Sequence, residues 1–384
     1  MSHKPSKDYQ KRKLELTLLA TLLEFLGLFA FLFSGWNIHL RNILENRIGS
    51  HFLILSPFYI LIIAIIHEVL FFPFAFIKGY RLEHRYHLSN QKFLVWMKDH
   101  LKSMIIGWIL GLGAILCVYS LLRLYPVGWW WRAGLVLWVI YVFLVKFAPL
   151  FLFPLFFKFK PLQDEILKNK ILEITKTAGV HVKGVYEFDM SRKTKSVNAA
   201  ITGLGSTCRI LLADNLLSHF TQEEIMAVVA HELGHHKHRH LVKGIFFNFI
   251  LLLLFLFASE MAIRESADYF QFRSPADMAT FPLIALVFSI GSLLFLPITN
   301  AILRSFERHS DRFALETTRN PAAFISMMEK LSNENLAEDS PHPIIEFLFH
   351  SHPSAKKRVA LAQSYLGPIF TPSREHPEIR GQSL

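Results

Sequence analysis

Apolar residues gather into six long segments of the 384-residue chain, and shorter polar stretches separate them. Each segment is long enough to cross about 30 Å of hydrocarbon as a helix that rises about 1.5 Å per residue. The predicted spans cover residues 14–35, 52–77, 103–124, 129–153, 242–262 and 281–303. The pattern therefore predicts a predominantly α-helical, polytopic membrane protein with about six transmembrane helices.

Two stretches outside the spans are predicted to form one small α+β domain. Residues 164–177 have helical periodicity, whereas 184–189 and 208–213 have the pattern of short strands and 196–202 that of a further extended segment. The predicted parts are a membrane region of four spans (1–153), a soluble domain (154–241), a membrane hairpin (242–303), the C-terminal part of the soluble domain (304–371) and a tail (372–384).

The distribution of basic residues predicts how the chain is oriented. Residues 1–13 carry five Lys and Arg and residues 78–102 carry six, whereas 36–51 and 263–279 carry two each. Basic loops stay on the inside of a membrane, so both termini and the soluble domain are predicted to be cytoplasmic. A bacterial inner membrane and an ER membrane fit this orientation equally well.

Composition agrees with a membrane protein and argues against one class of partner. Hydrophobic residues make up 52% of the chain and charged residues 18%. Most of the net charge of +11 flanks the spans on one side. We therefore attribute it to topology and to contact with membrane lipids, and no nucleic-acid partner is predicted.

The strongest chemical signal is a His-Glu-x-x-His motif at residues 231–235. Thr221 and Glu224 form a capping box that predicts a helix starting just before the motif. On that helix His231 and His235 lie one turn apart on the same face, where one metal ion can bind both. Glu232 points away from that face, which suits a general base better than a ligand.

A third ligand is expected from the segment after the sixth span. Glu307 and Asp311 lie one helical turn apart, so Glu307 can bind the metal while Asp311 orients a histidine ligand. Two spans separate His235 from Glu307, which returns the chain to the same side of the membrane. Position 241 is Leu241, which excludes the metzincin pattern with a third histidine there. Two imidazoles and one carboxylate predict one Zn²⁺ per chain, with the fourth position open for water.

The basic run after the motif, residues 236–240, has two possible interpretations. Its Lys, Arg and His side chains either line the membrane surface or add ligands to the metal site. We favour the first, because long basic side chains extend toward the membrane surface at the ends of spans.

With these motifs the chain resembles the integral-membrane zinc proteases that include the type I CAAX prenyl proteases and the HtpX-type proteases. Four stretches carry the resemblance: residues 231–240, residues 306–314, residues 196–199, and residues 351–353 with Arg358. Four spans before the metal-binding helix make the CAAX branch the closer one.

The resemblance implies a gluzincin-type zinc endopeptidase beneath a barrel of transmembrane helices that encloses a chamber. It implies that His352 and Arg358 bind the oxyanion, and that Asn198 and Ala199 align the substrate as an added strand. The implied reaction is C-terminal processing of prenylated peptides. The alternatives are an HtpX-like protease that degrades misfolded membrane proteins and, less favoured, a non-catalytic scaffold or channel. The expected partners are peptide or protein substrates and membrane lipids, and the oligomeric state stays open.

Overall fold

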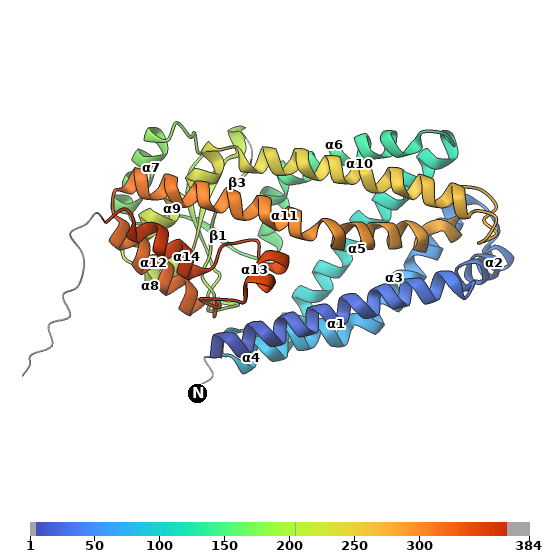
Figure 1. Ribbon diagram of the computed structural model, residues 1–384, viewed down its shortest axis with the longest axis horizontal. Coiled ribbons are helices and arrows are strands. Elements are labelled where there is room, and N and C mark those ends of the chain that lie inside the picture. The colour runs from blue at the N-terminus through green and yellow to red at the C-terminus, as the bar shows by residue number, and fades with distance from the viewer. Residues whose placement is uncertain (1–4, 204, 367–384) are drawn as a thin grey trace, which may run out of the picture.

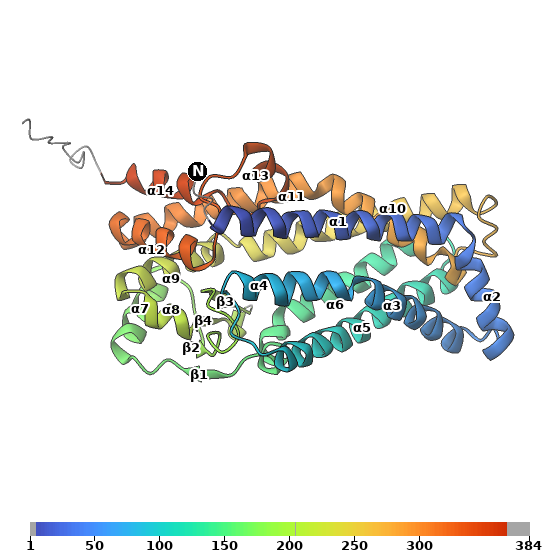
Figure 2. The ribbon, with the colours of Figure 1, turned by 90° about the horizontal axis from the view of Figure 1, so that it is seen from below.

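The structure is a computed structural model that describes residues 5–203 and 205–366. The predicted tail, 372–384, lies outside the described residues, as do residues 367–371 of the preceding part. Long helices run side by side through most of the molecule, and a smaller domain of short helices and strands lies at one end of them (Figure 1, and Figure 2 after a turn of 90°).

Six helices of the described chain are long and apolar enough to cross a membrane, which confirms the number of predicted spans. They are α1 (Pro5–Phe33), α3 (Phe52–Phe76), α5 (Phe93–Leu124), α6 (Trp129–Phe151), α10 (His240–Ser266) and α11 (Phe281–Thr318). Many of their large apolar side chains are exposed, as lipid-facing residues are. Helix α11 continues well past the predicted end at 303 and carries the chain from the membrane into the soluble domain without a break.

Between the six spans the structure is not solidly packed. A cavity of about 300 Å³ lies between α1, α3, α5 and α11 and is lined by both Glu24 and His67. The Nε2 atom of His67 lies 3.8 Å from the Glu24 carboxylate. Ionisable side chains inside a membrane normally face protein or water, so their position on this cavity agrees with a water-accessible interior.

The end of the helices away from the soluble domain is closed by ion pairs. Helix α2 (Trp36–Ile48) connects α1 to α3 there, and its 13 residues reach only about 20 Å, too short for a span. Buried Arg41 on α2 pairs with Asp277, just before the short helix η4 (Met278–Thr280). Arg273 donates to Glu45 at 2.7 Å. These pairs fix the turn of the α10–α11 hairpin against the first spans.

The soluble domain contains a four-stranded sheet of order β1-β2-β4-β3. Strands β2 (Val185–Phe188), β4 (Arg209–Ala213) and β3 (Ala199–Thr202) lie within the three segments predicted to be extended. Strand β1 (Phe159–Pro161) was not predicted, because three residues ending in proline carry too little pattern. Strand β3 pairs antiparallel with β4 and leaves its other side as the edge of the sheet.

Helices cover this sheet and complete one core. They are α7 (Glu165–Thr177), α8 (Asp214–His219), α9 (Gln222–Lys237), α12 (Pro321–Glu334), α13 (Pro343–Phe349) and α14 (Ala355–Gln363). Fully buried Ile171, Leu212, Leu233 and Phe324 join α7, β4, α9 and α12 in a single apolar cluster. This core holds α9, which carries the His-Glu-x-x-His motif, between the sheet and α11.

Candidate metal centre and active site

Helix α9 begins with the predicted capping box. The Thr221 hydroxyl accepts a hydrogen bond from the backbone of Glu224, and the Glu224 carboxylate accepts one from the Thr221 backbone at 2.8 Å. Glu224 also accepts bonds from Ser326 at 2.6 Å and Lys330 at 2.7 Å on α12. Burial would raise the pKa of Glu224, but the bonds from Lys330 and Ser326 outweigh burial and lower it. The start of α9 is therefore anchored as an ionised pair to α12.

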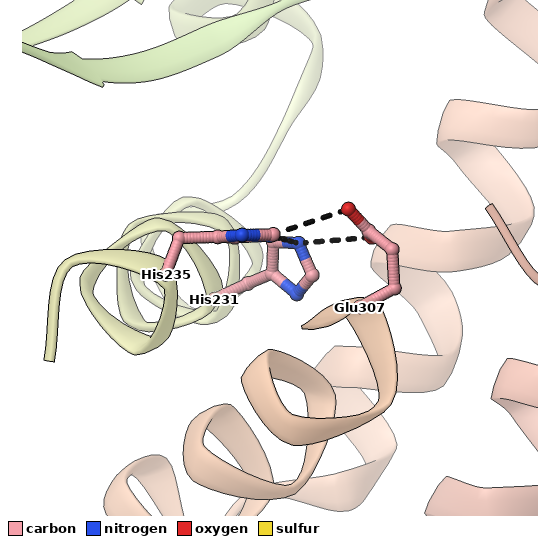
Figure 3. Close-up of side chains that lie close together, drawn as sticks. All are labelled: His231, His235 and Glu307. Atoms are coloured by element: carbon pink, nitrogen blue, oxygen red, sulfur yellow. Dashed lines mark hydrogen bonds and ion pairs between the residues drawn. The ribbon is translucent and has the colours of Figure 1, made fainter. Parts of the chain in front are cut away.

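Two imidazoles from α9 and one carboxylate from α11 converge on one point (Figure 3). Each of His231, His235 and Glu307 offers a ligand atom, and these atoms lie within 4.8 Å of one another. The two Nε2 atoms are 3.2 Å apart and lie 3.4 Å and 3.3 Å from the Glu307 oxygens. Two neutral imidazole nitrogens and a carboxylate are a donor set that zinc accepts, so these residues fit a zinc ion.

A glycine allows the two helices to approach closely enough for this arrangement. A Cβ atom at Gly234 would lie 2.8 Å from the Cα atom of Ser310 on α11, closer than real Cβ contacts. The approach brings the carboxylate of Glu307, one turn before Ser310, over the imidazoles of α9. The glycine inside the motif thus contributes to the site through packing.

Behind the first imidazole lies a buried pair of charges. The Nδ1 atom of His231 lies 2.9 Å from Asp311, and Arg358 donates to both oxygens of Asp311 at 2.8 Å and 2.5 Å. Burial would lower the pKa of His231, but hydrogen bonds to Asp311 and Glu307 outweigh burial and raise it to about 9. Asp311 holds a proton on Nδ1, so Nε2, which faces Glu307, is the atom that would give up its proton and serve as the ligand atom.

The two residues proposed from the C-terminal motif lie at different places. His352 is exposed, and its Nδ1 atom lies 3.0 Å from Glu307. The Arg358 side chain is only 12% exposed, and its donors to Asp311 include both Nε and Nη2. The guanidinium therefore lies behind His231, and its Nη2 atom is also 3.8 Å from the Glu307 oxygen that His352 approaches more closely.

Glu232 lines a cavity of about 350 Å³ beside the metal group. Its other walls include His235 and Glu307, as well as Tyr141 and Asn248 from the membrane helices α6 and α10. Burial raises the pKa of Glu232, while the charges of His231 and His235 oppose the rise. A carboxylate that binds a proton more readily than usual suits the role of a general base.

The predicted substrate-binding residues lie at the start of β3: Asn198 directly precedes the strand and Ala199 is its first residue. The carbonyl of Asn198 accepts a hydrogen bond from Ala213 at the end of β4, at 3.1 Å. In an antiparallel pair, alternate residues direct their backbone groups to the partner strand and away from it. Asn198 therefore uses its backbone in the sheet, while its side chain is exposed. The N–H and C=O of Ala199 face the open edge.

Two neighbours of Ala199 on this edge are already bonded. The side-chain amide of Asn335, at the end of α12, accepts from the Val197 N–H at 2.9 Å and donates to the Val197 carbonyl at 3.3 Å. The N–H of Ile201 is bonded to the Glu232 carboxylate. Between these two residues lies Ala199, whose backbone groups face the same edge. Asn335 was not predicted, because no local pattern marks a side chain that bonds the backbone of a residue 138 positions away.

His240 corrects the interpretation of the basic run. Its side chain is buried, stacked on Phe306 with ring centroids 4.2 Å apart, and does not line the membrane surface. Its Nδ1 atom lies 3.2 Å from the Nδ1 atom of His235. The sequence does not distinguish His240 from the exposed Lys237, His238 and Arg239 before it. Only its packing on Phe306 and its contact with His235 set it apart.

Comparison with known proteins places the chain in a family. Residues 161–366 match the model of peptidase family M48. The chain belongs to peptidase family M48. Residues 1–158 match a second model, described as CAAX prenyl protease N-terminal, five membrane helices. The described part of 1–158 contains four helices that could span a membrane and the shorter α2.

Proteins from other organisms are similar to this chain over most of their length. An uncharacterized metalloprotease, YhfN, from Bacillus subtilis is 28% identical over 93% of this chain and 84% of its own. A CAAX prenyl protease 1 homolog from Dictyostelium discoideum is 27% identical over 92% and 85%. The crystal structure of S. mikatae Ste24p has a TM-score of 0.82 over 93% of this chain and 88% of that chain, at 20% identity, and shows the shared fold.

These findings confirm the family that the motifs resembled and the predicted class of protein. The M48 chain is an integral membrane metalloprotease, with a fold like that of Ste24p.

Proposed function

We propose that this M48 protein is a zinc-dependent endopeptidase that cleaves prenylated peptides near their C-terminus. The observation that carries the proposal is the convergence of His231, His235 and Glu307 beside Glu232, in a cavity that also reaches the membrane helices. A site so placed can receive a peptide whose lipid group stays in the bilayer. Relatives named CAAX prenyl proteases support this substrate class.

The residues of the site divide the reaction between them. His231, His235 and Glu307 would hold zinc, which when bound supplies Lewis-acid chemistry that polarises the scissile carbonyl. Glu232 takes a proton from the attacking water and passes it to the leaving amine. His352, beside Glu307, is placed to donate to the oxyanion that develops.

For Arg358 we propose a positioning role in place of the predicted contact with the oxyanion. Its guanidinium is held by both oxygens of Asp311, which in turn bonds His231. Asp311 and Arg358 therefore fix the orientation of that imidazole. Asn198 and Ala199 keep their proposed role, with the backbone of Ala199 as the group that pairs with substrate.

A direct assay separates this function from its alternatives. Purified protein in lipid discs is given a farnesylated CAAX peptide, the same peptide without the farnesyl group, and an unfolded membrane protein. We expect cleavage of the farnesylated peptide, at a higher kcat/KM than that of the unmodified one. Preferential cleavage of the unfolded membrane protein would support the HtpX-like role instead. A protein that binds no zinc and cleaves none of the three would be a scaffold or channel.

We also propose that the soluble domain and the N-terminal end of α1 face the cytoplasm. Figure 1 places the start of α1, the soluble domain and helix α4 (Leu82–Arg85) toward the same end of the molecule, with α2 at the other. The described part of the basic segment 1–13 and the basic segment 78–102 belong to the first end. Basic segments remain on the cytoplasmic side, which supports this orientation.

His240 is expected to hold His235 in the tautomer that binds metal. If Nε2 of His235 is the ligand atom, Nδ1 carries the proton and donates to His240. His240→Phe keeps the stacking on Phe306 but removes the acceptor, so zinc affinity should fall roughly 10–100-fold. Competition with a chromophoric chelator measures the affinity. His240→Asn, which restores an acceptor, should recover part of it, and equal affinities for both variants would contradict the role.

Asn335 is expected to hold the substrate-pairing edge in place. Asn335→Ala removes two hydrogen bonds to Val197, worth about 1 kcal/mol each. We expect KM for a peptide to rise about tenfold while zinc affinity is unchanged. Asn333→Ala, at an exposed position two residues earlier on α12, is the matched control. A loss of kcat and zinc together would instead mean that the whole site had shifted.

A further inference from the structure

A basic cavity lies between α1 and the helical extension of α3, far along the chain from the metal group. Its volume is about 610 Å³, and its walls include Arg12 from α1 together with Arg81 and Arg85. The remaining walls are mainly apolar, with Leu16 and Leu19 among them. The cavity therefore combines a cationic part with an apolar part.

The ends of the predicted spans place the membrane boundary between the two parts of this arginine cavity. The apolar run of α1 begins at Leu14, just after Arg12, and that of α3 ends at Ile77, just before Arg81. At about 1.5 Å per residue, Arg12 and Arg81 lie within about one turn of the ends of the hydrocarbon-spanning stretches. The arginines are thus at the level of lipid head groups, and the leucines at the level of acyl chains.

The three arginines are exposed, and they differ from two basic residues nearby in lacking a side-chain partner in the described part of the chain. Lys13 donates to the Tyr9 hydroxyl, and Lys78 donates to Thr17, both at 2.8 Å. Among the described residues, the three arginines of the cavity form no ion pair or side-chain hydrogen bond.

One acidic residue, Glu15, also lines the cavity. Its carboxylate lies 3.9 Å from the ammonium group of Lys11, one turn earlier on α1. Three guanidinium groups against one carboxylate leave the cavity positively charged. Guanidinium groups bind phosphate through two parallel hydrogen bonds, so the charge complements a phosphate better than a neutral head group.

The local backbone contributes to the shape of the cavity. A π-helix, η1 (Ile77–Arg81), interrupts the helix between α3 and α4, and its first and last residues both line the cavity. A π-helical turn changes the angular spacing of side chains, and such turns are frequent at functional sites. In a regular α-helix Ile77 and Arg81 would be stacked one turn apart; here their spacing around the axis is altered.

From its positive charge, its level at the ends of the predicted spans and its apolar wall, we infer that the arginine cavity binds one anionic glycerophospholipid. The phosphate contacts Arg12, Arg81 and Arg85, and an acyl chain lies along Leu16 and Leu19. The head group is recognised by its net negative charge, so a zwitterionic lipid binds more weakly.

The position of the cavity connects such a lipid to the rest of the protein. Leu82, another wall residue, packs with Tyr9 and Leu88 in a small buried cluster. Ser89 next to this cluster bridges to Thr194, in the segment that leads into β3. A lipid bound here holds α1 against α4 beside the contact between the membrane helices and the soluble domain.

The test measures lipid binding and does not depend on proteolysis. Full-length protein in discs of phosphatidylcholine containing a small fraction of phosphatidylglycerol is extracted into mild detergent, and retained lipid is counted by native mass spectrometry. We expect one phosphatidylglycerol per chain. Replacing Arg12, Arg81 and Arg85 by Gln should weaken its retention at least tenfold. The control replaces exposed Lys7, Lys92 and Lys98 by Gln, which removes the same charge, and should retain the lipid.

Three results would overturn the inference. One is equal loss of lipid from the control, because the effect would then be one of net charge. Another is equal retention of phosphatidylcholine and phosphatidylglycerol. The third is displacement of the lipid by millimolar inorganic phosphate, which would assign the arginines to free phosphate. Gel filtration confirms that each variant is folded, and zinc content shows separately whether the metal site is intact.

Discussion

Glu232→Gln is expected to reduce kcat for peptide cleavage by about 10²–10⁴-fold, while zinc content stays at that of the unaltered protein. Glutamine has nearly the shape of glutamate but cannot take a proton, so only the general base is removed. Glu232 does not belong to the group of converging ligand atoms, so the metal should remain. Cleavage kinetics and metal analysis on the same preparation measure both quantities.

The matched control for this prediction is Glu223→Gln on the same helix. Glu223 is exposed near the start of α9, so its replacement removes one negative charge without altering the cavity. We expect its activity to be within about twofold of the unaltered protein. If Glu232→Gln retained normal turnover, Glu232 could not be the base. If it lost zinc, the carboxylate would have to be reassigned to the metal shell.

The membrane part of the fold could be predicted because lipid imposes a simple pattern. A helix that crosses hydrocarbon must be apolar over its whole length, and six such segments were visible. The pattern does not show where a helix ends once it leaves the lipid. Helix α11 therefore extends to Thr318, past the predicted 303, because its polar continuation packs on α9.

Some residues of the candidate site could be predicted from local spacing, whereas others come together only when distant segments pack. His231, Glu232 and His235 lie close together on one helix, and their spacing already indicates that the two histidines share a face while Glu232 lies beside it. Glu307 required a topological argument, since its position depends on the chain crossing the membrane twice. The contacts of Asn335 with Val197 and of Arg358 with Asp311 arise only when separate segments pack, and no spacing reveals them.

Glu307 is the decisive residue for the architecture, because it links the two halves of the site. It lies on α11, separated from the α9 histidines by a membrane hairpin, yet its oxygens are 3.3 Å and 3.4 Å from their ring nitrogens. Without it, the metal group of the described chain would consist of two imidazoles. Two ligands hold zinc far less tightly than three, because each missing donor leaves the ion to water.

Glu307→Ala is accordingly expected to lower zinc affinity by more than roughly 10²-fold. This exceeds the loss of affinity that follows replacement of residues that only hydrogen-bond to the ligands. Peptide cleavage should fall with the zinc content. Chelator competition measures the affinity, and excess zinc should restore cleavage only in part. The control Glu346→Gln removes another buried carboxylate, paired with Lys357 at 2.8 Å, and should cost stability while zinc stays bound. Full zinc retention by Glu307→Ala under chelator would show that a different residue is the third ligand. The return of the chain through the α10–α11 hairpin would then not account for zinc binding.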